Sequence, residues 1–177
     1  MSETEDISAI QTDSVGELTC SKCKSVLDVT DFPAFSEIAC PACSEKLAVP
    51  ARLGAFRLTR LLGKGGMGAI YHGIDDALGR DVAVKVMLKS LGSDEALVET
   101  FRREARMAAA LNHPNVVQIY SCGQEKGQPY IVMELVQGKT MEDIMNHTGP
   151  MLDALALGMG LDVAKGLSAG FEIGLVH

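Results

Sequence analysis

Alternating apolar and polar positions in the middle of the chain predict a series of β-strands. Residues 56–62 alternate, residues 69–74 are rich in strand-forming types, and residues 82–87 alternate again, with three valines sharing one face. A glycine-rich stretch, residues 63–68, separates the first two segments. Because a strand and not a helix is expected after the glycines, the pattern predicts a hairpin and disfavours the strand-to-helix turn of dinucleotide-binding folds.

A helical spacing of apolar residues appears between residues 93 and 111. Phe101 and Ala105 belong to one apolar stripe, and Glu104 falls within the same stripe. The serine or the aspartate at positions 93 and 94 is a suitable N-cap. The segment therefore predicts a helix that packs on the sheet and carries one carboxylate toward it.

Helical spacing returns in residues 153–175, but four glycines lie between positions 155 and 171. Each glycine costs a helix about 1 kcal/mol relative to alanine. We therefore expect this second helix to form because neighbours pack around it, and not through its own propensity.

Lys85 stands between two apolar residues on one face of the third predicted strand. A buried ammonium needs an anion, and Glu104 is the partner that we favour, although this carboxylate could instead pair with an arginine on its own helix. The glycines of residues 63–68 let backbone N–H groups approach a phosphate without a Cβ in the way. The plainer alternative is a glycine-rich turn without a ligand.

Further motifs follow in order, and together they carry a resemblance to a known family. They are the segments LNHPNVV at 111–117, YIVMELV at 130–136 and LVH at 175–177. With the glycine loop, Lys85 and Glu104, they resemble a protein kinase of the bacterial serine/threonine type over residues 56–177.

This resemblance implies an α+β fold. Residues 56–136 would form the kinase small lobe, a five-stranded antiparallel sheet with one helix, with the hinge at its end, and residues 137–177 would form the first helices of the large lobe. In a kinase the second predicted helix packs against other large-lobe elements. We therefore expect residues 151–177 to expose apolar surface when the chain is expressed alone.

The resemblance also implies ATP as the ligand. Lys85 would contact the α- and β-phosphates and Glu104 would orient it, so these two are the candidate catalytic residues. The residues expected around ATP are the loop, three that roof the adenine, a gatekeeper and two in the hinge. The loop residues are Gly63, Lys64, Gly65, Gly66, Met67 and Gly68, and the residues above the adenine are Leu62, Ile70 and Ala83. The gatekeeper is Met133, and the hinge residues are Glu134 and Val136.

Phosphoryl transfer in the family needs an H-R-D aspartate, an asparagine and a D-F-G aspartate around the γ-phosphate and magnesium. In the family order these would follow His177. We therefore expect this chain to bind nucleotide but to be catalytically incomplete, as a fragment of a parent that uses ATP and Mg²⁺ to phosphorylate serine or threonine of a protein substrate. The alternative from another class is a non-catalytic nucleotide-binding or adaptor module.

Four cysteines near the N-terminus form two C-x-x-C pairs, at the spacing of a four-cysteine zinc site. They are Cys20, Cys23, Cys40 and Cys43. The alternative is two disulfides. Because the first nineteen residues lack the basic and apolar segments of a secretory signal, we expect a reducing, cytoplasmic setting and a structural zinc ribbon over residues 17–49.

Charge and hydropathy narrow the classes of partner that this chain is expected to bind. The net charge is −7, and the ribbon carries three lysines against five acidic residues, which disfavours nucleic acid as a partner. The ribbon would then either bind a protein partner or have a purely structural role. Residues 1–16 are expected to be a disordered acidic leader and residues 50–55 a linker. Without eighteen consecutive apolar residues, the sequence predicts no membrane segment.

Overall fold

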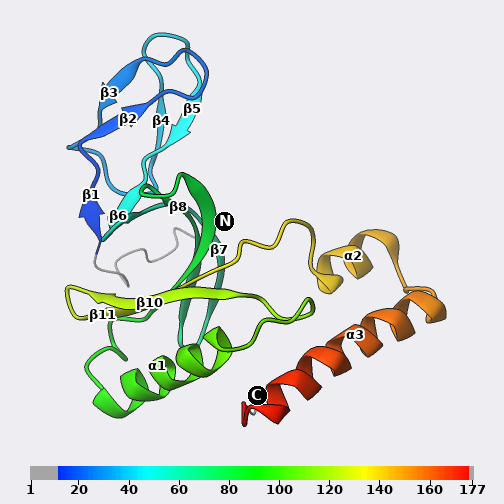
Figure 1. Cartoon of the computed structure of the whole chain (residues 1–177). Helices are drawn as coiled ribbons and strands as arrows, with labels where there is room; N and C mark the ends of the chain where they lie inside the picture. The colour runs from blue at the N-terminus through cyan, green and yellow to red at the C-terminus, as the bar shows by residue number, and fades with distance from the viewer. Residues whose placement is uncertain (1–11, 176–177) are drawn as a thin grey trace.

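A curled seven-stranded antiparallel sheet forms the centre of the structure, a computed structural model that describes residues 12–175 (Figure 1). The strands lie in the order β1-β6-β7-β8-β9-β11-β10. In chain order they are β1 (Asp13–Ser14), β6 (Ala51–Leu53), β7 (Phe56–Gly65), β8 (Gly68–Asp75), β9 (Arg80–Met87), β10 (Ile119–Glu125) and β11 (Gln128–Met133). The last five of these confirm the five-stranded sheet expected from the sequence.

The main apolar core lies on the face of β9 that carries the three valines. Val82, Val84 and Val86 are fully buried and pack with Leu58 of β7 and Tyr71 of β8. The strict alternation of the sequence placed these valines together, and burial of their side chains stabilises the curled sheet.

Helix α1 (Glu95–Ala109) covers the opposite face of β9 and β11. Its N-cap is Asp94, whose carboxylate accepts hydrogen bonds from the first-turn N–H groups of Ala96 and Leu97. Phe101 and Ala105 are buried against Met87 and Ile131. The predicted helix is therefore present, and the aspartate of the two candidates caps it.

The cysteine-containing segment folds as two small hairpins at one end of the sheet. They are β2 (Glu17–Thr19) with β3 (Val26–Asp28), and β4 (Glu37–Ala39) with β5 (Lys46–Ala48). Each C-x-x-C pair lies in the turn of one hairpin. Lys24 and Ser44 occupy equivalent turn positions with φ of 64° and 58°, so the two turns repeat one left-handed backbone geometry.

The segments on both sides of the ribbon differ from the sequence expectation. Residues 50–55 were expected to be a linker, but Ala51 and Leu53 of β6 are fully buried while Arg52 between them points outward. Asp13 and Ser14, assigned to a disordered leader, pair with β6 as β1. The alternation of only three residues is too short a pattern to identify β6 before its sheet is known. Residues 1–11 of the leader lie outside the described residues.

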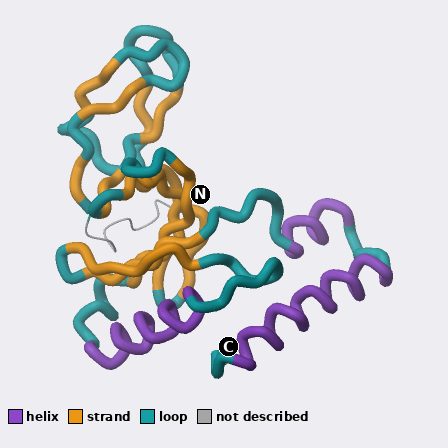
Figure 2. The backbone as a smooth tube through the Cα atoms, viewed as in Figure 1, coloured by secondary structure: helices purple, strands orange, loops and turns teal. Residues whose placement is uncertain are grey.

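Two helices follow the sheet and stand to one side of it (Figure 2). Helix α2 (Met141–Thr148) begins with a capping box between Thr140 and Asp143, and α3 (Asp153–Glu172) follows after a short loop. The exposed large apolar residues of α3 and its ends are Leu152, Leu155, Leu157, Leu161, Val163, Leu167, Phe171 and Ile173. Across residues 12–175, no helix has both the length and the apolar character needed to cross a membrane.

Candidate functional site

A hollow of about 400 Å³ lies beneath the turn between β7 and β8. Its lining consists of Gly63, Lys64, Gly65, Gly66, Met67, Gly68, Ile70 and Lys85. All eight were among the residues that the sequence pointed to. The volume is within the range of small-molecule sites in proteins. The hairpin and the neighbouring strand β9 together form this hollow.

The glycines of the hairpin have two different environments. Gly68 lies so close to β9 that a Cβ there would be 2.2 Å from the carbonyl oxygen of Val86, so the sheet itself requires glycine. A Cβ on Gly63, Gly65 or Gly66 would meet nothing within 4 Å. These three therefore leave open backbone beside the hollow, as an approaching phosphate requires. Gly65 pairs with Gly68, and the chain continues as a strand, which confirms the hairpin.

Lys85 reaches the hollow from β9, where it pairs with Ile70 of β8. Its side chain is half-buried, and Nζ lies 5.8 Å from the centroid of the Phe101 ring. Within residues 12–175, no ion pair of 4.0 Å or less joins Lys85 to Glu104. The expected pair is thus not formed in this structure. Helix α1 turns Phe101 and Ala105 toward the sheet, which leaves Glu104 exposed.

The remaining candidate ATP residues lie outside the lining of the hollow: Leu62 precedes it on β7, Ala83 is on β9, and Met133, Glu134 and Val136 lie at or just after the end of β11. Ala83 is buried and pairs with Met133, the candidate gatekeeper. The N–H of Glu134 donates to the carbonyl of Gln118 at 2.9 Å, so a ligand edge would meet the Glu134 carbonyl and not its N–H. Leu62 and Val136 are exposed.

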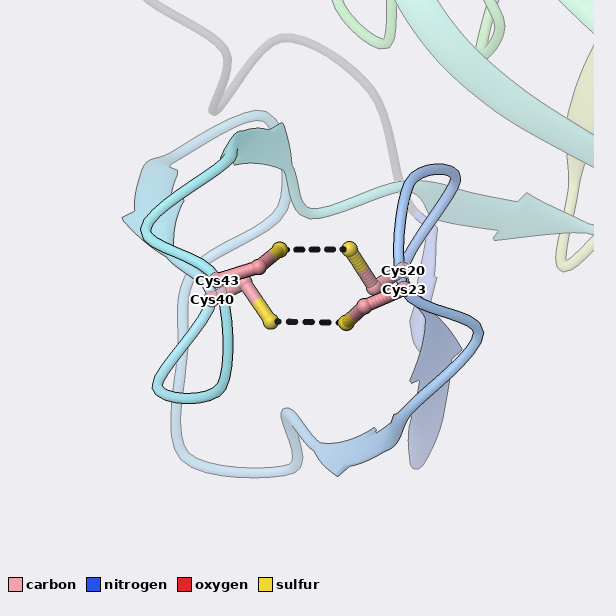
Figure 3. A group of neighbouring side chains, drawn as sticks. All are labelled: Cys20, Cys23, Cys40 and Cys43. Carbon is pink, nitrogen blue, oxygen red and sulfur yellow. Dashed lines mark hydrogen bonds between the residues drawn. The ribbon is translucent and has the colours of Figure 1, made fainter.

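A second cluster of chemical interest is formed by the four ribbon cysteines (Figure 3). Their sulfur atoms all lie within 4.8 Å of one another. Cys20 Sγ is 3.6 Å from Cys43 Sγ, and Cys23 Sγ is 3.6 Å from Cys40 Sγ, so each contact joins one hairpin to the other. Cys20 and Cys40 are buried, and all four thiols are free.

The sulfur spacing fits a tetrahedral metal ion. Zinc–sulfur bonds of about 2.3 Å place the sulfurs of a tetrahedron about 3.8 Å apart, whereas a disulfide requires about 2.05 Å. The observed 3.6 Å contacts agree with the first arrangement. A tetrahedral set of four cysteine sulfurs is typical of structural zinc sites and is otherwise used for iron–sulfur centres. The prediction from the C-x-x-C spacing that these four residues lie together is therefore confirmed.

The cluster separates the acidities of two of its thiols. Hydrogen bonding to the side chain and then the backbone of Ser25 lowers the pKa of Cys23 to about 6, with neighbouring sulfurs contributing. The pKa of Cys43 is raised to about 12: the backbone of Glu45 lowers it, but burial and the three other sulfurs together raise it by more. A thiolate is therefore favoured at Cys23 over Cys43.

Three contacts outside these clusters were not foreseen from the sequence. His72 Nδ1 contacts Thr59 Oγ1, and His72 Nε2 lies 3.1 Å from Asp81, so three adjacent strands are linked by polar side chains. The ring of Phe35, from the ribbon, stacks on Tyr71 of β8. The pairing of β7, β8 and β9 determines the His72 contacts, whereas the fold of the ribbon determines the Phe35 stack, and no local sequence motif predicts either.

Comparisons with known proteins point to one family. Residues 56–177 match the family model described as the protein kinase domain. The serine/threonine-protein kinase PknA of Mycobacterium tuberculosis is 39% identical over 129 residues, which cover 70% of this chain and 30% of the relative. The serine/threonine-protein kinase pkn2 of Myxococcus xanthus is 40% identical over 124 residues, which cover 70% of this chain and 15% of the relative.

Among solved structures, the kinase domain of PknI from M. tuberculosis superimposes with a TM-score of 0.62 at 27% identity. The match covers 70% of this chain and 50% of that one. The chain thus spans less than a third of the length of the two curated relatives. The family match begins at residue 56, so the four-cysteine ribbon lies outside it.

Proposed function

Because the chain belongs to the protein kinase domain family, we propose that it binds ATP between the glycine-rich hairpin and the hinge. The observation that carries this proposal is the hollow in which open glycine backbone and the Lys85 ammonium face one space. Backbone N–H groups and a lysine are complementary to a triphosphate, since both donate hydrogen bonds to anionic oxygen. Ala83, Met133 and the Glu134 carbonyl would hold the adenine beyond it.

The parent protein would use ATP and Mg²⁺ to transfer the γ-phosphate to a serine or threonine of a protein substrate. The curated relatives are serine/threonine-protein kinases, which favours this activity over the non-catalytic adaptor. Lys85 would orient the phosphates. The aspartates and asparagine that act on magnesium and the γ-phosphate in the family have no counterpart among these 177 residues. The proposal for residues 56–177 is therefore nucleotide binding, and transfer is proposed for the parent protein.

Titration of the chain with a fluorescent ATP analogue tests the proposal. Lys85→Ala should weaken binding by about tenfold or more, because a hydrogen bond to a charged group contributes about 1.5–3 kcal/mol. The matched control is Lys89→Ala, an exposed lysine just beyond the same strand, which should bind within about twofold of the parent. No saturable binding, or equal losses in both variants, would contradict an ATP site here.

A second function follows from the cysteine cluster: we propose that it holds one structural Zn²⁺. The convergence of four sulfurs at tetrahedral spacing supports this site. Closed four-sulfur sites leave no position for substrate, so the metal would supply folding energy to the ribbon and no chemistry. Because four free thiols persist in a reducing compartment, we propose a cytoplasmic location.

Metal analysis of the purified protein tests this site. The parent should contain one zinc per chain, and the double variant Cys23→Ser, Cys43→Ser should contain none. Cys122→Ser is the matched control because Cys122 is a free, exposed thiol on β10, away from the cluster. If the control loses zinc as the double variant does, or the double variant keeps it, the ribbon does not hold the metal.

A further inference from the structure

The ribbon is joined to the nucleotide-binding lobe by its flanking strands, β1 and β6, and by one aromatic contact. We propose that the metal-bound ribbon braces the nucleotide site, with Phe35 as a positioning residue that acts on β8 through Tyr71. This inference rests on the ATP and zinc sites proposed above. It assigns to the ribbon a regulatory role: occupancy of the four-cysteine site sets the affinity of the neighbouring lobe for nucleotide.

The first link is the backbone on both sides of the ribbon. β1 enters the ribbon and β6 leaves it, and the two strands pair through Asp13 with Arg52 and Ser14 with Ala51. β6 in turn pairs with β7, the strand that ends in the glycine-rich turn. The ribbon is therefore fixed at both of its ends to the edge of the sheet that forms the hollow (Figure 1).

The second link is the stack between Phe35 and Tyr71. The ring centroids are 5.2 Å apart and the planes differ by 19°. Phe35 lies between the two ribbon hairpins, where its N–H donates to the carbonyl of Val49. Its φ is 64°, in the left-handed region that a bulky side chain rarely adopts. The turn that holds this backbone conformation also fixes the direction of the Phe35 ring.

Tyr71 transmits the position of Phe35 to the hollow. It is buried on β8, where it pairs with Leu61 of β7 and Val84 of β9. The preceding residue, Ile70, lines the hollow and pairs with Lys85. A shift of the Tyr71 ring must therefore move the strand that forms one wall of the hollow and carries Gly68 at its start.

Binding of the metal would determine whether Phe35 keeps this position. The buried residues of the ribbon are few: Cys20, Cys40 and Leu47 form one cluster, and Val29 and Val49 are buried besides them. A segment of about 30 residues with so small a core does not fold stably without a metal or disulfides. Loss of the ion should therefore release the hairpins, and with them the stack on Tyr71.

The test uses the whole chain loaded with zinc, and compares it with the chelated form. Two readouts are needed: the affinity for a fluorescent ATP analogue, and hydrogen exchange of the β8 amides, residues 68–75. Chelation should weaken nucleotide binding by about fivefold or more, the usual size of coupling between sites. It should also speed exchange in β8. Re-addition of Zn²⁺ should restore both.

Variants separate the brace from general stability. Phe35→Ala, and Phe35→Leu should the first fail to fold, ought to reproduce both effects while zinc content stays at one per chain. Phe35→Tyr keeps an aromatic ring and should rescue both readouts. Phe32→Ala is the matched control, since Phe32 is an exposed aromatic residue of the same ribbon.

The outcomes distinguish this inference from the functions on which it rests. If the zinc-loaded parent binds nucleotide but neither chelation nor loss of the Phe35 ring changes affinity, the brace is wrong and the ATP site stands. If the parent binds no nucleotide, the ATP site fails, and unchanged β8 exchange on chelation would overturn the brace as well. If chelation instead made β8 exchange faster, the mechanical link from the ribbon to β8 would stand, but its proposed effect on ATP affinity would not.

Discussion

Nζ of Lys85 lies over the ring of Phe101, 5.8 Å from its centroid, and so meets the aromatic residue of α1 and not the carboxylate of Glu104. A cation over an aromatic face is attracted to the ring, which gives the half-buried ammonium a favourable neighbour. Phe101 also fills the contact between α1 and the strands β9 and β11. The helix therefore docks on the sheet through apolar packing.

Two substitutions in α1 should therefore change the free energy of unfolding by different amounts. Phe101→Ala should lower the free energy of unfolding by about 3–5 kcal/mol, because it empties a buried aromatic site. Glu104→Gln should change it by less than about 0.5 kcal/mol, since this side chain is exposed and makes no ion pair with Lys85. Urea unfolding measures both. A several-fold loss of ATP-analogue affinity in Glu104→Gln would instead show that α1 turns to form the pair when nucleotide binds.

The two environments of the hairpin glycines predict a second contrast. Gly68→Ala would force a Cβ within 2.2 Å of the Val86 carbonyl, so strand pairing must distort at a cost of about 1–3 kcal/mol. Gly66→Ala, two positions earlier in the same turn, meets open space and should leave the melting temperature nearly unchanged. Thermal unfolding followed by circular dichroism compares them. Equal melting temperatures would refute the close packing at Gly68.

Burial of a polar side chain provides a third prediction. Gln128 is 2% exposed, and its Nε2 donates to the carbonyl of Met87 at 2.8 Å, which joins β11 to the end of β9. Gln128→Leu would leave that buried carbonyl without this donor and should cost about 1–3 kcal/mol. Gln124→Leu, at an exposed position of β10, is the control and should be nearly neutral. Similar losses in both would argue against the buried hydrogen bond.

The capping box of α2 should respond to acid. The Thr140 hydroxyl, and then its backbone N–H, donate to the Asp143 carboxylate and hold its pKa below the ordinary value of 3.8. A carboxyl with a lowered folded pKa stabilises the folded helix above about pH 4, and this contribution is lost as the pH falls through the folded pKa. Thr140→Val should therefore raise the Asp143 pKa in an NMR titration, whereas Thr148→Val at the other end of α2 should not.

The exposed apolar residues of α3 should make the isolated chain bind hydrophobic dyes. Replacing Leu157, Leu161 and Phe171 by glutamine should reduce dye fluorescence strongly, since each is more than half exposed. Deletion of residues 151–177 should do the same. Leu78→Gln is the control, because Leu78 is equally exposed but stands in the turn between β8 and β9. Negligible dye binding by the parent would show that another part of the chain covers α3.

Sequence patterns predicted most of the lobe because its signals are local and regular. The valine alternation of β9, the cap at Asp94 and the paired C-x-x-C turns each specify their structure within a few residues. The contacts that were missed depend on residues far apart in the chain. β6 is recognised only through its pairing with β7, the Phe35 stack through the fold of the ribbon, and the exposure of Glu104 through the exact rotation of α1 on the sheet.

The pairing of Ser14 with Ala51 places the two ends of the ribbon side by side, at the spacing of neighbouring strands. Residues 15–50 are thus topologically one long loop grafted between two strands of a hairpin. Such an arrangement makes the ribbon a removable module: a tight two-residue turn could join Ser14 to Ala51 without altering the course of β1 or β6. Such a deletion would keep the backbone of the lobe continuous while it removes the Phe35 ring from Tyr71.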